Sequence, residues 1–74
     1  MKKKKIQILG LNKLFKFVLE ASKVEGDVLV HRGKFCADGK SLMNMMSINF
    51  SDVCYVEYPK DAIKFEKYLK QVEI

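Results

Sequence analysis

Histidine, proline and cysteine are scarce in this chain of 74 residues, which contains one histidine, one proline and two cysteines. His31 has no carboxylate, cysteine or second histidine close to it in the sequence, so the pattern offers neither a metal site nor a catalytic triad. Cys36 and Cys54 form no CxxC motif, and both lie in apolar, strand-like segments. We therefore interpret both as buried small hydrophobic residues of a reduced protein, rather than as a disulfide.

Long apolar runs and glycine-rich loops are also missing. No segment approaches the roughly 20 apolar residues of a membrane span. The apolar run after the N-terminal lysines is broken at Asn12 and Lys16, too early for a secretory signal. No phosphate-binding glycine loop and no nucleophile–base pair is present. We therefore expect a cytoplasmic, non-enzymatic protein without a cofactor, a metal ion or a membrane partner.

The composition is that of a globular protein, with 49% hydrophobic and 31% charged residues. A chain of this length forms one domain, which we expect to span residues 1–74. The net charge of +5 is uneven, because Lys2, Lys3, Lys4, Lys5, Lys13 and Lys16 precede the first acidic residue. We interpret the first lysines as the solvated start of an edge strand, where they discourage aggregation. The alternative is a small basic nucleic-acid-binding domain that uses these lysines, but no arginine cluster or aromatic platform accompanies them.

Apolar periodicity predicts seven elements. They are strand 6–9, a helix from about Asn12 to Lys23, strand 27–32, strand 35–37, a short helix after Ser41, strand 53–58 and a last helix from Pro59. Asn12 is the expected N-cap of the first helix. An apolar stripe is expected along the last helix, formed by Ala62, Phe65, Leu69 and Val72. This βαββαβα order indicates an α+β open-faced sandwich, in which helices cover one face of a four-stranded sheet.

The segment from Gly39 to Ser47 predicts a turn followed by a capped short helix. Ser41 is the expected N-cap, since its hydroxyl can accept a hydrogen bond from the first helical turn. The helix has more apolar side chains than one buried face requires: Leu42, Met43, Met45, Met46 and Ile48. We expect Met45 and Ile48 to lie in the core, which leaves an apolar surplus for contact with another protein.

The string Lys-Ser-Leu-Met-x-x-Met-Ser at residues 40–47 resembles the segment around the regulatory serine of HPr, the phosphocarrier of the bacterial sugar phosphotransferase system. The resemblance runs without a gap from about Ile8 to Phe50. It implies the open-faced sandwich described above, and it implies that the first and middle helices form a docking face for other proteins. By this register, the candidate partner-binding residues are Phe15, Leu19, Lys40, Leu42, Met43 and Met46.

The resemblance fails at the active-site loop, where HPr carries Leu-His-x-Arg-Pro. One register places Gly10 at the histidine, Asn12 at the arginine and Lys13 at the proline, and a second register places Asn12 at the histidine. Neither register supplies an imidazole, and His31 belongs to another element. We therefore predict that the chain is not a histidine phosphocarrier, and that it is Crh-like in this respect.

Ser41 has two interpretations. The first is a helix cap worth about 1 kcal/mol, which is a sufficient reason for a serine at this position. The second is phosphorylation by a serine kinase, which the resemblance implies, with Lys40 adjacent to the phosphate. Together these patterns predict a non-catalytic, HPr-like regulatory or adaptor module that binds a protein partner, with a homodimer as a further alternative.

Overall fold

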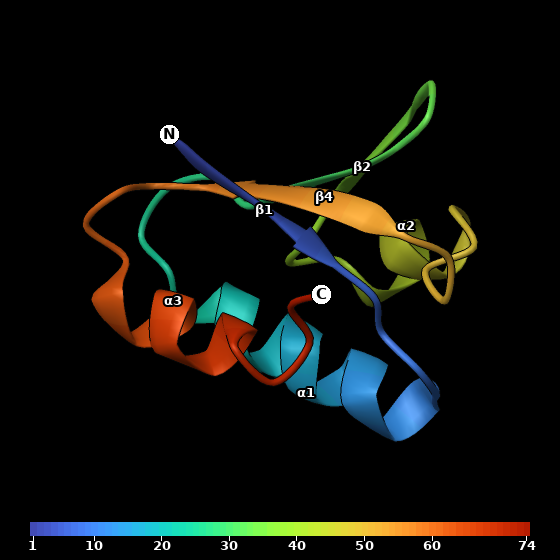
Figure 1. Ribbon diagram of the computed structural model, residues 1–74, viewed down its shortest axis with the longest axis horizontal. Helices are drawn as coiled ribbons and strands as arrows, with labels where there is room; N and C mark the ends of the chain where they lie inside the picture. Colours follow the sequence, from blue (N-terminus) through green and yellow to red (C-terminus); the bar gives the residue numbers. More distant parts are fainter.

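The computed structural model describes residues 1–74 and confirms the βαββαβα order. Its elements are β1 (Lys2–Ile6), α1 (Leu11–Ser22), β2 (Leu29–Arg32), β3 (Phe35–Asp38), α2 (Leu42–Met46), β4 (Cys54–Tyr58) and α3 (Ile63–Leu69). The four strands form one antiparallel sheet with the order β1-β4-β2-β3. Figure 1 shows α1 and α3 side by side against one face of this sheet, which leaves the other face open.

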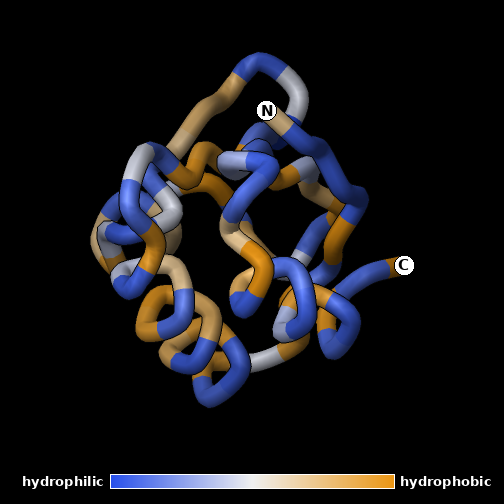
Figure 2. The backbone as a smooth tube through the Cα atoms, turned by 90° about the vertical axis from the view of Figure 1, so that its left-hand side faces the viewer, coloured by the Kyte–Doolittle hydropathy of each residue, from blue (hydrophilic) through white to orange (hydrophobic).

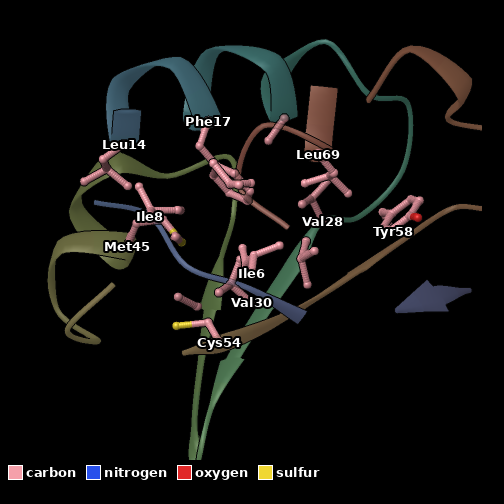
Figure 3. Packing of buried hydrophobic residues seen from close by; sticks show 14 of the residues in the cluster. Ile6, Ile8, Leu14, Phe17, Val28, Val30, Met45, Cys54, Tyr58 and Leu69 are labelled. Atoms are coloured by element: carbon pink, nitrogen blue, oxygen red, sulfur yellow. The ribbon is translucent and has the colours of Figure 1, made fainter. Parts of the chain in front are cut away.

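The core lies between the sheet and the helices, because each strand turns every second side chain inward. In β4, Cys54, Val56 and Tyr58 are buried, whereas Tyr55 between them is exposed. The helices are amphipathic, with hydrophobic and hydrophilic positions following one another around each coil (Figure 2). Figure 3 shows how Met45 of α2 joins the same core as the buried residues of α1 and the sheet.

Aromatic side chains connect the two long helices to the sheet. The Phe65 ring of α3 meets the Phe17 ring of α1 at a centroid separation of 5.8 Å and the Tyr58 ring of β4 at 5.6 Å, both edge to face. The Tyr58 hydroxyl donates a 2.7 Å hydrogen bond to Glu66 Oε2, so its polar end is satisfied at the margin of the core. Burial and this bond to a carboxylate both raise the pKa of Tyr58.

The first strand lies earlier than expected, at Lys2–Ile6 rather than at residues 6–9. The expected position followed the apolar residues, but an edge strand needs few of them, and only Ile6 of β1 is buried. Lys2 and Lys4 point toward the helical layer, where they pair with Glu66 at 2.9 Å and Glu73 at 3.3 Å. The lysines do lie on an edge strand, as their interpretation required.

The outer edge of β1 is itself partly covered by the C-terminal segment. The amide of Gln7 donates to the Val72 carbonyl at 2.9 Å, and the amide of Ile74 donates to the Lys5 carbonyl at 3.0 Å. Ile6 and Glu73 form an antiparallel bridge between these two hydrogen bonds. The opposite edge, β3, has no such cover.

Both long helices begin at positions other than those expected. The N-cap of α1 is Gly10, not Asn12, because the chain enters the helix with φ of 104° at that residue, a conformation that favours glycine. The last helix begins at Ile63, because a turn with a hydrogen bond from the Ala62 amide to the Pro59 carbonyl precedes it. Of the expected apolar stripe, Phe65 and Leu69 are buried within α3, and the partly buried Ala62 and the buried Val72 flank it.

The two cysteines are both free thiols, but only Cys54 is buried. The prediction for Cys36 was wrong: this residue is exposed on β3. The reason is alternation along the strand, since Ala37 takes the inward position and Cys36 must face the opposite side of the sheet. None of the three helices is long and apolar enough to cross a membrane.

Candidate partner-binding surface

An exposed apolar stripe runs along α1. Leu11, Phe15 and Leu19 recur at a spacing of four residues, which places them on one side of a helix. Their exposed fractions are 50%, 50% and 53%, although each is a large apolar residue. The core is contacted instead by Leu14 and Phe17. This stripe therefore remains available on the outside of the helical layer.

The short helix α2 continues this apolar surface. Met43 is 83% exposed and Met46 is 54% exposed, whereas Met45 and Ile48 are buried, as expected. Leu42 is half-buried and packs against the core. Because α2 packs against α1, the exposed residues of the two helices lie on adjacent elements. We define the apolar surface as Leu11, Phe15, Leu19, Leu42, Met43 and Met46.

Leu11 is the member of the apolar surface that sequence reasoning did not select. Its signal was present, since it lies four residues before Phe15 on the same helical side. The expected N-cap at Asn12 places Leu11 one residue before the helix, next to the residues at helical spacing but not among the predicted binding residues. The observed N-cap at Gly10 places Leu11 in the first turn of α1.

Ser41 is the N-cap of α2, as expected. Its backbone is extended, and its hydroxyl accepts a 3.3 Å hydrogen bond from the Asn44 amide. The turn before it is closed by Asp38, whose Oδ1 accepts from the Lys40 amide at 2.9 Å and whose carbonyl accepts from the Ser41 amide at 3.0 Å. The serine is only partly buried, so its hydroxyl is also within reach of solvent.

Lys40 does not extend over Ser41. Its Nζ donates a 2.6 Å hydrogen bond to the carbonyl oxygen of Val24, just beyond the end of α1. The backbone of Gly39 also contacts the segment after α1, because its amide donates a 2.7 Å hydrogen bond to the Val28 carbonyl. A Cβ at Gly39 would stand 2.7 Å from Val28 Cγ1, so only glycine fits there without displacement. The segment before α2 is therefore held closely against the segment that follows α1.

The loop before α1 ends at the N-cap Gly10, and the exposed Asn12 and Lys13 follow in the first turn of the helix. The structure gives neither Asn12 nor Lys13 a side-chain hydrogen bond or an ion pair. The one histidine of the chain is not in this loop but on β2. This end of α1 therefore carries no imidazole.

His31 lies on the open face of the sheet, because Val30 beside it is buried on the helical side. Its Nε2 is hydrogen-bonded to Glu57 Oε1 of β4. Sequence reasoning found no carboxylate near this histidine, since the two residues are 26 positions apart and only the sheet brings them together. His31 is thus a partnered residue on a different element from the apolar surface.

Several of the N-terminal lysines already interact with other residues of the same molecule. Besides the ion pairs of Lys2 and Lys4, Lys3 Nζ lies 5.4 Å from the centre of the Tyr55 ring. Lys16 pairs with Glu20 at 2.9 Å, and this hydrogen bond lowers the pKa of Glu20. These contacts leave Lys5 and Lys13 as the unpaired members of the basic set that a nucleic acid would require.

No family model and no curated protein matches the chain. Solved structures do resemble it, and two HPr proteins are among them. HPr-C-His from Thermoanaerobacter tengcongensis superposes with a TM-score of 0.79 and 26% sequence identity, over 96% of this chain and 93% of that chain. The phosphocarrier protein HPr from Bacillus anthracis str. Ames superposes with a TM-score of 0.70 and 22% identity, over 92% of this chain and 90% of that chain. The sheet order, the three helices and these neighbours agree with the resemblance seen in the sequence, and the chain is an HPr-like protein in fold.

Proposed function

We propose that this chain is a non-catalytic, cytoplasmic HPr-like adaptor or regulatory module that binds a protein partner through α1 and α2. The observation that carries the proposal is the apolar surface on two adjacent helices, in which Phe15, Met43 and three neighbours are exposed and Leu42 is half-buried. Exposed apolar groups gathered in this way are characteristic of protein contact sites. Methionine side chains add adaptability, since they are unbranched and can fit more than one partner shape.

The free energy available from burying these exposed side chains against a partner is sufficient for a specific complex. A large apolar side chain contributes about 1.5–3 kcal/mol when it passes from full exposure to full burial. Phe15 and Leu19 are half exposed, and Met43 is 83% exposed, so a partner could still gain much of that contribution at each of the three. A few such residues at the centre of an interface dominate its affinity.

The absence of histidine from the loop before α1 supports a role other than phosphate transfer. Gly10 and Asn12 cannot form a phosphoramidate, and Lys13 stands where the family has a proline. His31, the one imidazole of the chain, is engaged with Glu57 on the open face of the sheet. We expect no phosphate on the protein after incubation with phosphoenolpyruvate and the general transfer enzyme of the phosphotransferase system.

The partner-binding role is tested by substituting two exposed residues at once, Phe15→Ser with Met43→Ser, and comparing the proteins that each immobilised variant captures from cell extract. The matched control is Phe35→Ser with Val53→Ser, since these residues are 60% and 40% exposed but belong to neither α1 nor α2. We expect the double substitution on the helices to weaken one captured complex at least about tenfold at fixed salt, and the control to leave it unchanged. Equal loss in both variants, or no loss in either, would contradict the proposal.

Ser41 provides a site for regulation of this module by phosphorylation. Its hydroxyl is partly exposed, and it stands next to the apolar residues of α2. A phosphate there would add charge at the border of an apolar contact, and so change which partner binds. The test is the intact mass after incubation with ATP and an HPr serine kinase, beside a Ser41→Ala variant. One added phosphate on the wild type alone supports regulation, and an unchanged mass leaves Ser41 as a helix cap only.

A further inference from the structure

A cysteine, a histidine and a glutamate lie in adjacent strands on the open face of the sheet. In the β2–β3 pair, His31 is directly opposite Cys36. On its other side, β2 pairs with β4, where Glu57 holds the His31 side chain. Residues opposite one another in an antiparallel pair have their side chains on the same face and within a few ångströms of each other. The order of residues across three strands is thus thiol, imidazole and carboxylate.

The hydrogen bond that His31 donates to Glu57 determines which nitrogen of the imidazole is basic. A carboxylate can only accept, so the neutral imidazole carries its proton on Nε2, the atom bonded to Glu57. The free electron pair is then on Nδ1, on the other side of the ring. Because β4 and β3 flank β2 on opposite sides, an imidazole that directs Nε2 toward β4 turns Nδ1 away from β4. Cys36 lies on that other side.

Cys36 is accessible as well as aligned with the histidine. It is exposed, it lies on the uncovered edge strand of the sheet, and it forms no disulfide. The second thiol offers a contrast within the same molecule, because Cys54 is buried in the core and burial raises the pKa of its thiol. A small reagent can therefore reach one cysteine and not the other.

We propose that Cys36 is a site of reversible modification by low-molecular-weight disulfides such as glutathione disulfide, with His31 as proton acceptor and Glu57 as the residue that positions His31. The site is on the face opposite the one that α1 and α3 cover, so it does not depend on the proposed partner-binding role. The modification adds a bulky, charged group to the open face of the sheet.

The step balances without a further reactant. Nδ1 of His31 accepts the proton of the Cys36 thiol while the sulfur attacks one sulfur of the disulfide. A new sulfur–sulfur bond forms between Cys36 and one half of the reagent, and the old sulfur–sulfur bond breaks. The other half leaves as a thiolate, which takes the proton from His31. Cys36 is oxidised, and half of the reagent is reduced to a free thiol.

Other charged and titratable groups of this face surround the pair and are present in every variant described below. They are Asp38 on β3, Tyr55 on β4, Lys3 and Lys5 on β1, and Lys34 in the hairpin turn. Because both signs of charge are represented, a change in reactivity on removal of His31 reports the imidazole rather than the charge of the whole face.

The test follows adduct formation with glutathione disulfide by intact mass, over a range from about pH 6 to about pH 9.5. The informative variant is His31→Gln, whose side-chain amide can still donate to Glu57 but has no basic nitrogen. We expect the rate to fall about tenfold near pH 7 and to match the wild type near pH 9.5, where hydroxide can accept the thiol proton in place of the imidazole. Glu57→Gln should give an intermediate rate with the same convergence at high pH.

Two cysteine variants identify the modified residue. Cys54→Ser should react as the wild type does, and Cys36→Ser should gain no adduct. Thermal unfolding of each variant shows whether the fold is retained, and a convergence of rates at high pH is not expected of a merely structural defect. An adduct on Cys54, or a His31→Gln rate equal to the wild type at every pH, would overturn the proposal.

Discussion

A hydrogen bond between Lys40 and Val24 connects the two helices of the apolar surface. The ammonium group of Lys40 donates a 2.6 Å hydrogen bond to the carbonyl oxygen of Val24, so the turn before α2 is tied to the chain just after α1. The lysine was expected to belong to the binding residues themselves. This contact gives Lys40 a supporting role beside its predicted role in binding, because it fixes the relative position of the exposed methionines and the stripe on α1.

Removal of the Lys40 ammonium should therefore lower stability without changing the core. We expect Lys40→Met to reduce the free energy of unfolding by about 1 kcal/mol, since a partly buried carbonyl loses its charged donor. Urea unfolding measures the change. Lys34→Met, in the exposed hairpin turn, is the matched control and should change stability by less than about 0.5 kcal/mol. Equal effects at both positions would show that the hydrogen bond contributes nothing.

Gly39 should not tolerate a side chain. In Gly39→Ala, the new Cβ would stand 2.7 Å from Val28 Cγ1 and 3.1 Å from the Val28 carbonyl oxygen, so β2 or the turn must move. We expect a loss of about 1–3 kcal/mol in the free energy of unfolding. Gly33→Asn is a suitable comparison, because Gly33 has φ of 58° and open space, which asparagine accepts at small cost. A Gly39→Ala variant as stable as the wild type would show that the contact between Gly39 and Val28 has room for a Cβ.

Substitutions at Ser41 should separate its role as a helix cap from its proposed regulatory role. Ser41→Ala removes the acceptor for the Asn44 amide and should cost about 1 kcal/mol in the free energy of unfolding. Ser41→Asp supplies another good N-cap acceptor and should retain most of that stability. Thermal or urea unfolding of the two variants distinguishes them. If both lose the same amount, the capping hydrogen bond is not what the serine contributes.

Stability should decline in alkaline solution because of the buried tyrosines. Burial raises the pKa of Tyr58, and it raises the pKa of Tyr68 to about 12. Above about pH 10 the unfolded chain releases these protons while the folded chain retains them, so stability present below pH 10 is lost as the pH rises toward the folded pKa values. Urea midpoints should therefore fall progressively through this range.

The Tyr58→Phe variant isolates one of these groups. Near neutral pH it should be less stable than the wild type by about 1 kcal/mol, because the hydrogen bond to Glu66 is lost. The difference should narrow above about pH 10, since phenylalanine has no proton to release. A difference that stays constant through the alkaline range would contradict the raised pKa. The phenolate absorbance of the wild type gives an independent measurement.

The order and type of the elements were predictable from the sequence, because buried faces repeat every second residue in strands and every third or fourth in helices. The positions of Met45, Ile48 and Ser41 followed from the same reasoning, and the structure confirms them. What failed were features that periodicity does not record. The strand β1 has only one buried residue, and the N-cap of α1 depends on the backbone angle of Gly10.

The open-face cluster was beyond sequence reasoning for a different reason. His31 and Glu57 are 26 positions apart, and Cys36 reaches the same face only because the hairpin register places it opposite His31. Strand pairing of this kind is set by the whole sheet, not by the local pattern. An apolar neighbourhood also misled the interpretation of Cys36, since a strand alternates between a buried and an exposed side.

The cover that the C-terminal segment gives to β1 limits how these molecules can associate through their sheets. β3 presents unpaired backbone groups along its length, whereas the β1 edge exchanges hydrogen bonds with residues 72 and 74 around Lys5–Gln7 and stays open only at Lys2–Lys4. Growth of a continuous sheet from molecule to molecule needs two free edges on each unit. The open part of the β1 edge is short and carries lysines, which disfavour pairing, so association through the backbone is favoured at β3 and growth into a fibre is disfavoured.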